Sequence, residues 1–227
     1  RDLGGRIAKA LEQALHPLIA ARIDDTLEAR LRELVALAPL HNAPAVDGIA
    51  EARRALPDVP HVAVFDTAFH ATIPDVAATY ALPERWRGEI RRYGFHGLSV
   101  QWSSEQVRVP RLVVCHLGGG CSVTAVLDGR SVDTTMGFTP LEGVPMATRP
   151  GSVDPGALLH LLREGVPLDE LDEAIEHESG LLGLSGISGS VEELELSSES
   201  AAALALAVFA YRVAGAIAAM AVALGGL

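Results

Sequence analysis

The chain has 227 residues, enough to bury the core of one large domain or two modest ones. Apolar residues make up 49% and charged residues 21%, as in soluble globular domains, while aromatic residues reach only 4%. The formal net charge of −11 argues against a nucleic-acid partner, because neutralising phosphates requires clustered Lys and Arg.

The chain is expected to begin with helix. Apolar residues recur at helical spacing from residue 1 to about residue 38, and Asp24 or Asp25 can cap the second half of that stretch. A Pro-punctuated turn at 39–44, which contains His41, and a helix over 46–55 are predicted next.

Short apolar runs then predict strands. Residues 61–65 are rich in β-branched side chains and end at Asp66, and an acid at the carboxyl end of a strand is where α/β sheets bind ligands. Residues 111–115 form a second run. A third strand over 121–127 is followed by Asp128-Gly129, which predicts a hairpin turn leading into 130–133.

The last part of the chain is predicted to be helical over 156–163, 168–177 and 201–223. The final helix is nearly long enough to cross a bilayer. Its central Arg212 and its many Ala and Gly residues favour a buried helix of a soluble protein over a membrane span. No secretory signal opens the chain, and the two cysteines fit a reducing cytoplasm.

The segment from His116 to Ser122 is the most suggestive local motif. Its three successive glycines would let backbone N–H groups converge on phosphate oxygens. A glycine hairpin corner is the alternative interpretation. Zinc is excluded, because Cys115, Cys121 and His116 are not accompanied by the fourth ligand that a structural site needs.

Two further segments carry positive charge. Residues 91–97 place two arginines and His96 beside a glycine, a group that could hold a phosphoryl; a solvated basic turn is the alternative. Residues 136–151 are rich in Gly and Pro and contain Arg149, which indicates a loop of the kind that meets substrates.

Taken in order, six motifs between about residues 36 and 190 resemble the acetate kinase family. They are Pro39-Leu-His-Asn42, Val64-Phe-Asp-Thr-Ala-Phe-His70, Arg92-Tyr-Gly-Phe-His-Gly97, Cys115-His-Leu-Gly118, Asp133-Thr-Thr-Met-Gly-Phe-Thr-Pro-Leu-Glu-Gly143 and Thr148-Arg149.

The resemblance implies an actin-like α/β fold, with two related ribonuclease H-like domains and a cleft between them. Residues 1–72 would be part of the N-terminal domain. Residues 73–227 would be part of the C-terminal domain, carrying the phosphate loop and the dimer-side helices. A homodimer is expected, with no membrane or nucleic-acid partner.

The activity implied is reversible, Mg²⁺-dependent phosphoryl transfer from ATP to acetate, giving acetyl phosphate and ADP. Propionate or butyrate kinase is a close alternative, because one methylene in an acyl pocket changes specificity by only about 1–3 kcal/mol. A catalytically inactive nucleotide-binding or scaffolding relative is the alternative from another class.

The resemblance also implies the site residues. Asp66, His96 and Arg149 would lie at the reacting phosphoryl, with His96 and Arg149 supplying positive charge. Acetate is already ionised near pH 7, so Asp66 is expected to orient Mg²⁺-bound water or substrate, and not to act as a base. The phosphate loop would comprise His116, Gly118, Gly119 and Gly120, and the substrate contacts would comprise His41, Phe95 and Pro140.

The chain also departs from the family pattern. Gly119 stands where Asn is usual and Val100 where His is usual. The family's N-terminal phosphate loop, its adenosine-binding Gly-Gly-Ile-Gly-Glu stretch and its Mg²⁺-binding Glu are not found. As printed, the chain is therefore expected to be incomplete at both ends and unable to finish the reaction, through truncation or missing internal segments.

Overall fold

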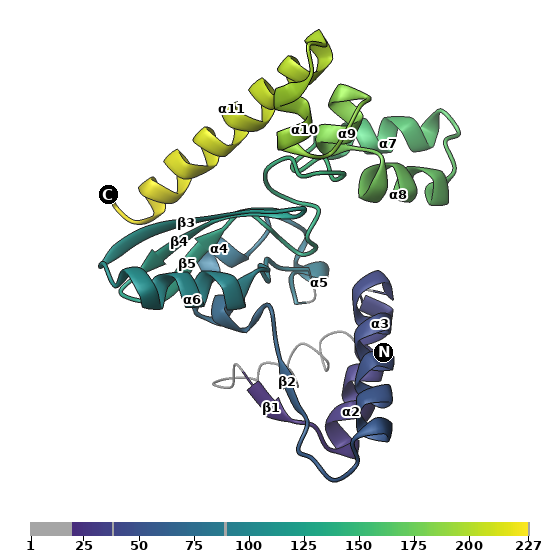
Figure 1. Ribbon diagram of the computed structural model, residues 1–227, viewed down its shortest axis with the longest axis vertical. Coiled ribbons are helices and arrows are strands. Elements are labelled where there is room, and N and C mark those ends of the chain that lie inside the picture. Colours follow the sequence, from purple (N-terminus) through teal and green to yellow (C-terminus); the bar gives the residue numbers. More distant parts are fainter. Residues whose placement is uncertain (1–19, 38, 89, 227) are drawn as a thin grey trace.

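The computed structural model describes residues 20–37, 39–88 and 90–226 (Figure 1). A small part combines a two-stranded sheet with helices α2 and α3, and a larger part is built on a three-stranded sheet. The two parts are joined through the segment that follows strand β2.

The small part begins with strand β1 (Ala20–Arg22), which pairs antiparallel with β2 (Val62–Val64). The helix predicted over residues 20–22 is therefore wrong, because pairing with a distant strand overrides local periodicity. Residues 1–19 of that prediction lie outside the described residues. Asp24 does cap α2 (Asp25–Glu33), since its Oδ1 accepts the Leu27 N–H at 2.7 Å.

The turn predicted over 39–44 is instead the beginning of helix α3 (Pro39–Ala55), which follows the short 3₁₀ helix η1 (Leu34–Leu37). Pro44 lies inside α3. As the sixth residue of α3, Pro44 lies beyond the first turn, so its missing N–H costs the helix one backbone hydrogen bond. The predicted helix over 46–55 is confirmed as the rest of α3.

The larger part is built on β3 (Arg111–Leu117), β4 (Cys121–Leu127) and β5 (Arg130–Thr134), an antiparallel sheet in that order. Asp128 and Gly129 have φ of 49° and 76°, the left-handed conformations of the tight hairpin that the sequence predicted. Strand β3 runs to Leu117, so His116 lies in the strand, opposite Ser122.

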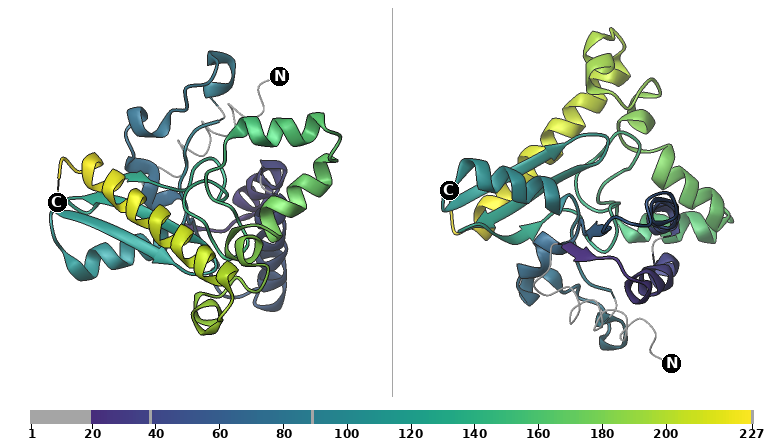
Figure 2. Two further views of the ribbon diagram at one scale, coloured as in Figure 1. Left: turned by 90° about the horizontal axis from the view of Figure 1, so that it is seen from above. Right: turned by 60° about the horizontal axis from the view of Figure 1, so that its bottom comes forward.

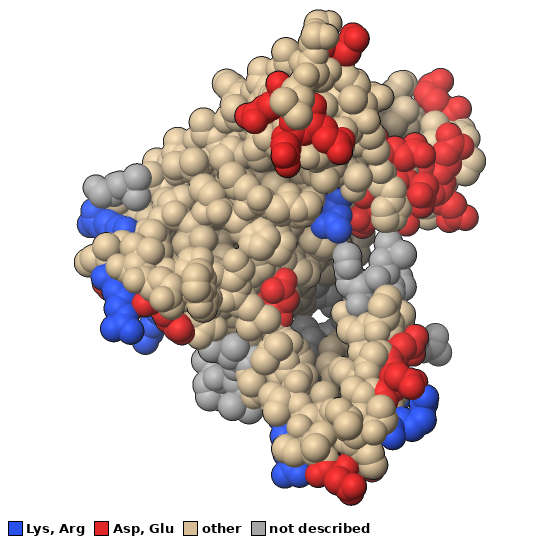
Figure 3. All heavy atoms as spheres, in the orientation of Figure 1, with Lys and Arg blue, Asp and Glu red and all other residues tan. Residues whose placement is uncertain are grey.

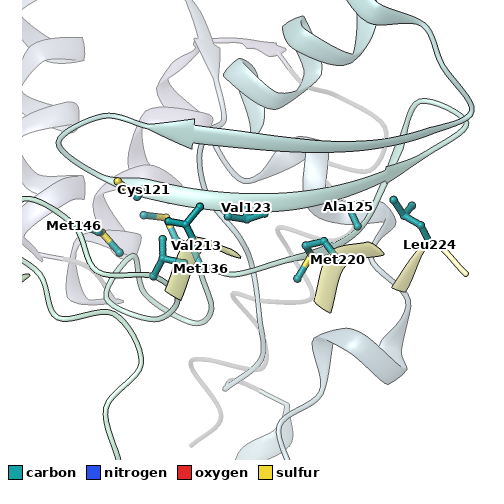
Figure 4. Packing of buried hydrophobic residues seen from close by; sticks show 9 residues of the cluster. Cys121, Val123, Ala125, Met136, Met146, Val213, Met220 and Leu224 are labelled. Atoms are coloured by element: carbon teal, nitrogen blue, oxygen red, sulfur yellow. The ribbon is translucent and has the colours of Figure 1, made fainter. Parts of the chain in front are cut away.

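One face of this sheet packs against the long helix α11 (Ser200–Ala223), as two views show (Figures 1 and 2). Alternate residues of β4 contact Val213, Met220 and Leu224 (Figure 4). Met136 and Met146, from the loop after β5, fill the remaining space. The β4 and loop members of this core are Cys121, Val123, Ala125, Met136 and Met146. The opposite face carries α6 (Gly97–Val107), which contacts β3.

Helix α11 is long and apolar enough to cross a membrane, with a mean hydropathy of 1.9 over its most apolar window, but only 17% of that window is buried. Length and composition alone are weak evidence for a span. Leu204, Tyr211 and Val222 are 58%, 76% and 78% exposed, so the predicted burial holds for one side of the helix.

Between the sheet and α11 the chain forms short helices. The predicted helices α7 (Pro155–Arg163) and α8 (Leu168–His177) are confirmed. α9 (Gly180–Ser185) and α10 (Val191–Leu196) pack with the start of α11 around Leu181, Leu194, Ala202 and Ala205. Acidic side chains gather over this region (Figure 3), including Asp169, Glu170, Glu192 and Glu193.

Before the sheet lie the 3₁₀ helix η2 (Ala68–Thr72) and two single-turn helices, α4 (Asp75–Ala78) and α5 (Glu84–Arg87). η2 packs against β5 and α6, which places residues 68–72 with the chain that follows them. The division into domains at residue 72 stays a prediction.

Gly180 provides a test of the packing between α9 and the loop before α7. Its φ is +62°, and an added Cβ would lie 2.2 Å from the Met146 carbonyl oxygen. Gly186, with φ of +66°, has open space around its Cβ position. Gly186→Ala should lower the free energy of unfolding by about 1–2 kcal/mol through backbone strain alone. Gly180→Ala should lower the free energy of unfolding, measured by urea denaturation, clearly more than Gly186→Ala does. Equal losses in the two variants would contradict this packing.

Candidate active site

Asp66 lies just after β2 and is bonded to the start of helix α6. Its Oδ2 accepts the backbone N–H of His96 at 2.7 Å, and its carbonyl oxygen accepts the N–H of Gly97 at 2.8 Å. A Cβ on Gly97 would lie 2.4 Å from that oxygen, so only glycine permits the approach. The exposed carboxylate of Asp66 is thereby fixed beside the positive end of α6.

His96 has a left-handed backbone, with φ of 61° and ψ of 20°. This conformation is uncommon for a residue other than glycine, and His is among the residues that adopt it more often. It turns the chain sharply into α6 and brings the imidazole against the sheet. There its Nδ1 lies 3.0 Å from Oγ of Ser122.

The imidazoles of His96 and His116 are stacked, with ring centroids 4.0 Å apart and planes 18° apart. Nδ1 of His116 lies 3.0 Å from Oγ of Ser99, in the first turn of α6. His96 reaches this contact from the N-cap of α6 and His116 from β3, the next element along the chain.

The glycine loop from Gly118 to Gly120 joins β3 to β4 beside these imidazoles. The N–H of Gly118 donates to the Gly120 carbonyl at 3.0 Å. A Cβ on Gly120 would lie 3.2 Å from Nε2 of His96, whereas a Cβ on Gly119 would meet nothing within 4 Å. The loop therefore leaves space at the rings that a side chain would fill.

Arg149 enters from the loop between β5 and α7. Its Nε lies 3.2 Å from Oε2 of Glu176, a nearly buried acid on α8. The same loop is bonded to the glycine loop, because the N–H of Ala147 donates to the Gly119 carbonyl at 3.2 Å. Among the described residues only Nε of this guanidinium has a protein acceptor, so both Nη groups can serve a ligand.

The surroundings of His96 favour its neutral form. Burial is the main cause, and the neighbouring basic side chains of His116 and Arg149 add to it, so that the pKa falls to about 4 although Asp66 acts in the opposite direction. These surroundings favour a neutral His96 near pH 7, whereas the sequence suggested a positive one, and the role of the ring at a phosphoryl stays a prediction. Arg149 is the guanidinium that would supply positive charge there.

Arg92 has a structural position. Its Nη1 donates to the carbonyl oxygens of Thr134, Thr135 and Met136 at 2.9–3.0 Å, and its Nη2 lies 2.8 Å from Oε1 of Glu142. The guanidinium thus closes the end of β5, with both of its Nη groups bonded to protein acceptors. The sequence alternative of a solvated basic turn is wrong for this residue, because Arg92 is largely buried.

For the predicted substrate residues the structure gives fewer contacts than for the residues around His96. Phe95 packs against the main core, and Pro140 is half-buried in the loop after β5. His41 lies in α3, and its side chain is outside the described part of the structure. The structure therefore brings together Asp66, His96, His116, the glycine loop and Arg149, while the acyl pocket stays a prediction.

His70 lies directly beneath the site and is fully partnered. Its ring nitrogens contact Oγ of Ser131 and the carbonyl oxygen of Phe95, each at 2.8 Å. Burial lowers the pKa of His70. The ring therefore fixes the backbone just before His96.

Three residues of the site were missed in the sequence: Ser99, Ser122 and Glu176. Ser122 belongs to the glycine motif, but its contact with His96 depends on pairing of β3 with β4 and on α6. Glu176 lies 27 residues beyond Arg149 in a helix with many acids, so nothing marked it.

No group of three or more His, Cys, Asp or Glu side chains that could hold a metal occurs among the described residues. A hollow of about 600 Å³ lies between β5 and α11 and is lined by Asp133, Glu142 and Arg212, among others. It does not include the residues that meet at His96.

Comparison with known proteins identifies the family of the chain. The model of the acetokinase family matches residues 3–227. An acetate kinase of Deinococcus radiodurans is 48% identical over 239 aligned residues, which cover 99% of this chain and 59% of that relative. The chain therefore belongs to the acetokinase family, and it spans about 59% of the length of that relative.

Solved structures share the fold. A propionate kinase from Francisella tularensis superposes with a TM-score of 0.85 at 38% identity, covering 89% of this chain and 56% of that one. An acetate kinase from Porphyromonas gingivalis gives 0.84 at 36% identity, covering 92% and 56%. The predicted fold class is thus confirmed as that of acetate and propionate kinases, of which this chain covers part.

The protonation of His96 can be measured directly. An NMR titration of its ring should give a pKa near 4, well below the ordinary 6.5. Between these values the unfolded chain binds a proton that the folded chain does not, so the free energy of unfolding should fall as pH is lowered through this window. His96→Gln should weaken that pH dependence in urea unfolding. A ring that titrates near 6.5 would contradict the assigned environment.

Proposed function

We propose that the full-length protein is an acetate kinase, catalysing reversible, Mg²⁺-dependent phosphoryl transfer between ATP and acetate. The observation that carries the proposal is the convergence of Arg149, the stacked His96 and His116, and Asp66 on one glycine loop. Family membership supports the same activity. Acetyl phosphate and ADP are the products in this direction.

The chemistry suits this arrangement. A phosphoryl in transfer spreads negative charge over its equatorial oxygens, so catalysis consists mainly of positioning and electrostatic stabilisation. Arg149 would supply a fixed positive charge through its Nη groups, while its Nε remains held by Glu176. The backbone of Gly118–Gly120 would follow the phosphate closely because no Cβ intervenes.

Asp66 fits a role beside Mg²⁺. The ion usually keeps several waters and is bound through few carboxylates plus substrate phosphates, so a single exposed acid is sufficient to orient a water of its shell. When bound, Mg²⁺ neutralises phosphate charge. Because acetate is already ionised near pH 7, Asp66 has no proton to remove.

Acyl-chain length and assembly are the less specific parts of the proposal. Propionate or butyrate kinase remains the alternative, supported by the structural likeness to the Francisella propionate kinase. We propose a cytoplasmic homodimer without a membrane or nucleic-acid partner. The exposed apolar side of α11 is a surface that a second copy could cover.

Arg149→Ala tests the activity itself. In the full-length protein, formation of acetyl hydroxamate from ATP, acetate and hydroxylamine should fall by roughly 10²–10³-fold, because one fixed donor at the phosphoryl is lost. Arg163→Ala, on an exposed position of α7, is the matched control and should keep full activity. ATP binding by the unaltered protein without any turnover would favour the inactive scaffold.

Asp66→Asn separates charge from hydrogen bonding, because the amide oxygen can still accept the His96 N–H. Activity should fall roughly 10–100-fold, and more Mg²⁺ should be needed for half-maximal rate. The comparison is a Mg²⁺ titration at several pH values. Recovery by raised pH alone, with unchanged metal dependence, would show that Asp66 acts as a base.

A further inference from the structure

The two stacked imidazoles present the same edge to the glycine loop. Nδ1 of each ring faces a serine hydroxyl at 3.0 Å, Ser122 for His96 and Ser99 for His116. The other nitrogen, Nε2, faces the loop: a Cβ on Gly120 would lie 3.2 Å from Nε2 of His96. Whatever occupies the space left by the glycines therefore meets Nε2.

Ser122 differs from Ser99 in its burial. Ser122 is completely buried in β4, and no buried polar side-chain atom in the described part of the chain lacks a partner. Nδ1 of His96 is the partner that Ser122 Oγ has among these residues. Ser99 is only half-buried, so water can satisfy its hydroxyl and its ring is less constrained.

The burial of Ser122 decides the direction of its hydrogen bond. A hydroxyl has one proton to donate, and leaving a buried donor without an acceptor costs about 1–3 kcal/mol. If Nδ1 carried the ring proton, the Ser122 proton would have no acceptor. The stable arrangement has Oγ–H of Ser122 donating to Nδ1, and a neutral ring then carries its only proton on Nε2.

We propose that Ser122 is a positioning residue that holds His96 in its neutral Nε2–H tautomer, so that the ring donates a hydrogen bond to a phosphoryl oxygen at the glycine loop. This inference rests on the proposed function for its ligand, but not for the tautomer itself. In the other tautomer a lone pair on Nε2 would face the phosphoryl oxygens and repel them.

The low pKa of His96 is consistent with this role. Its titratable and charged neighbours are His116, stacked on it, Asp66, bonded to its N–H, and Arg149, with the buried His70 nearby. With Arg149 supplying the positive charge, a neutral donor adds a directed hydrogen bond without repelling that guanidinium. This division of tasks explains how a half-buried ring can serve the site without a charge.

The tautomer can be observed without any assay. In a two-bond ¹H–¹⁵N spectrum near pH 7, assigned with His96→Gln, the His96 signals should show protonated Nε2 and unprotonated Nδ1. The reverse pattern, or an equal mixture, would overturn the proposal. The spectrum that decides the tautomer is recorded on the unaltered protein, and His96→Gln serves only to assign its signals.

Ser122→Ala tests the link to catalysis. The His96 signals should shift toward a mixture of tautomers. The kcat should fall on the order of 10–100-fold with little change in KM, a smaller loss than when a hydrogen-bond donor at the phosphoryl is deleted outright. Ser122→Thr, which retains the hydroxyl, should keep the tautomer and most of kcat. An unchanged kcat in Ser122→Ala would overturn the positioning role.

Thr124→Val is the matched control, because Thr124 is equally buried on the same strand and its Oγ1 lies 2.7 Å from Oγ1 of Thr134 instead of from an imidazole. It should lower the melting temperature comparably and leave the His96 signals unchanged. A shift of those signals as large as in Ser122→Ala would overturn the specific role of Ser122. Absence of phosphoryl transfer in the unaltered protein would instead refute the proposed function, while the spectrum would still decide the tautomer.

Discussion

The attachment of Asp66 to the first residues of α6 is the constraint on which the site depends. Two hydrogen bonds, from His96 N–H to the carboxylate and from Gly97 N–H to the carbonyl, join the segment after β2 to the helix on the main sheet. They fix the left-handed turn at His96, and that turn directs the imidazole toward β4. Because a Cβ on Gly97 would collide with the Asp66 carbonyl, the junction requires glycine there.

The rest of the site is supported from the other side of the glycine loop. Ala147 bonds to Gly119, Gly180 packs against the Arg149 backbone, and Glu176 holds the guanidinium from α8. Short helices that carry no catalytic side chain thus determine where Arg149 lies. The packing of α11 on β4 stabilises the opposite face of the same strand that presents Ser122.

Charge is distributed unequally between the groups that meet at the loop. Asp66 is exposed and Arg149 is held by an acid, whereas the imidazole of His96 lies in surroundings that favour its neutral form. The chain as a whole carries a net charge of −11, and acidic residues gather over α8 and α10. A few fixed donors would therefore have to provide the proposed anion binding, because the overall charge of the molecule opposes it.

The sequence by itself determined the three strands of the main sheet, the tight turn at Asp128-Gly129 and helices α7, α8 and α11, because these depend on local periodicity and turn chemistry. Its ordered motifs also indicated the family and the residues Asp66, His96, His116 and Arg149. Tertiary structure alone decided that residues 20–22 form a strand, that Arg92 closes β5, and that His96 is neutral beside Ser122. These features arise from contacts between residues distant in the chain, and burial and neighbouring charge have no local signature in the sequence.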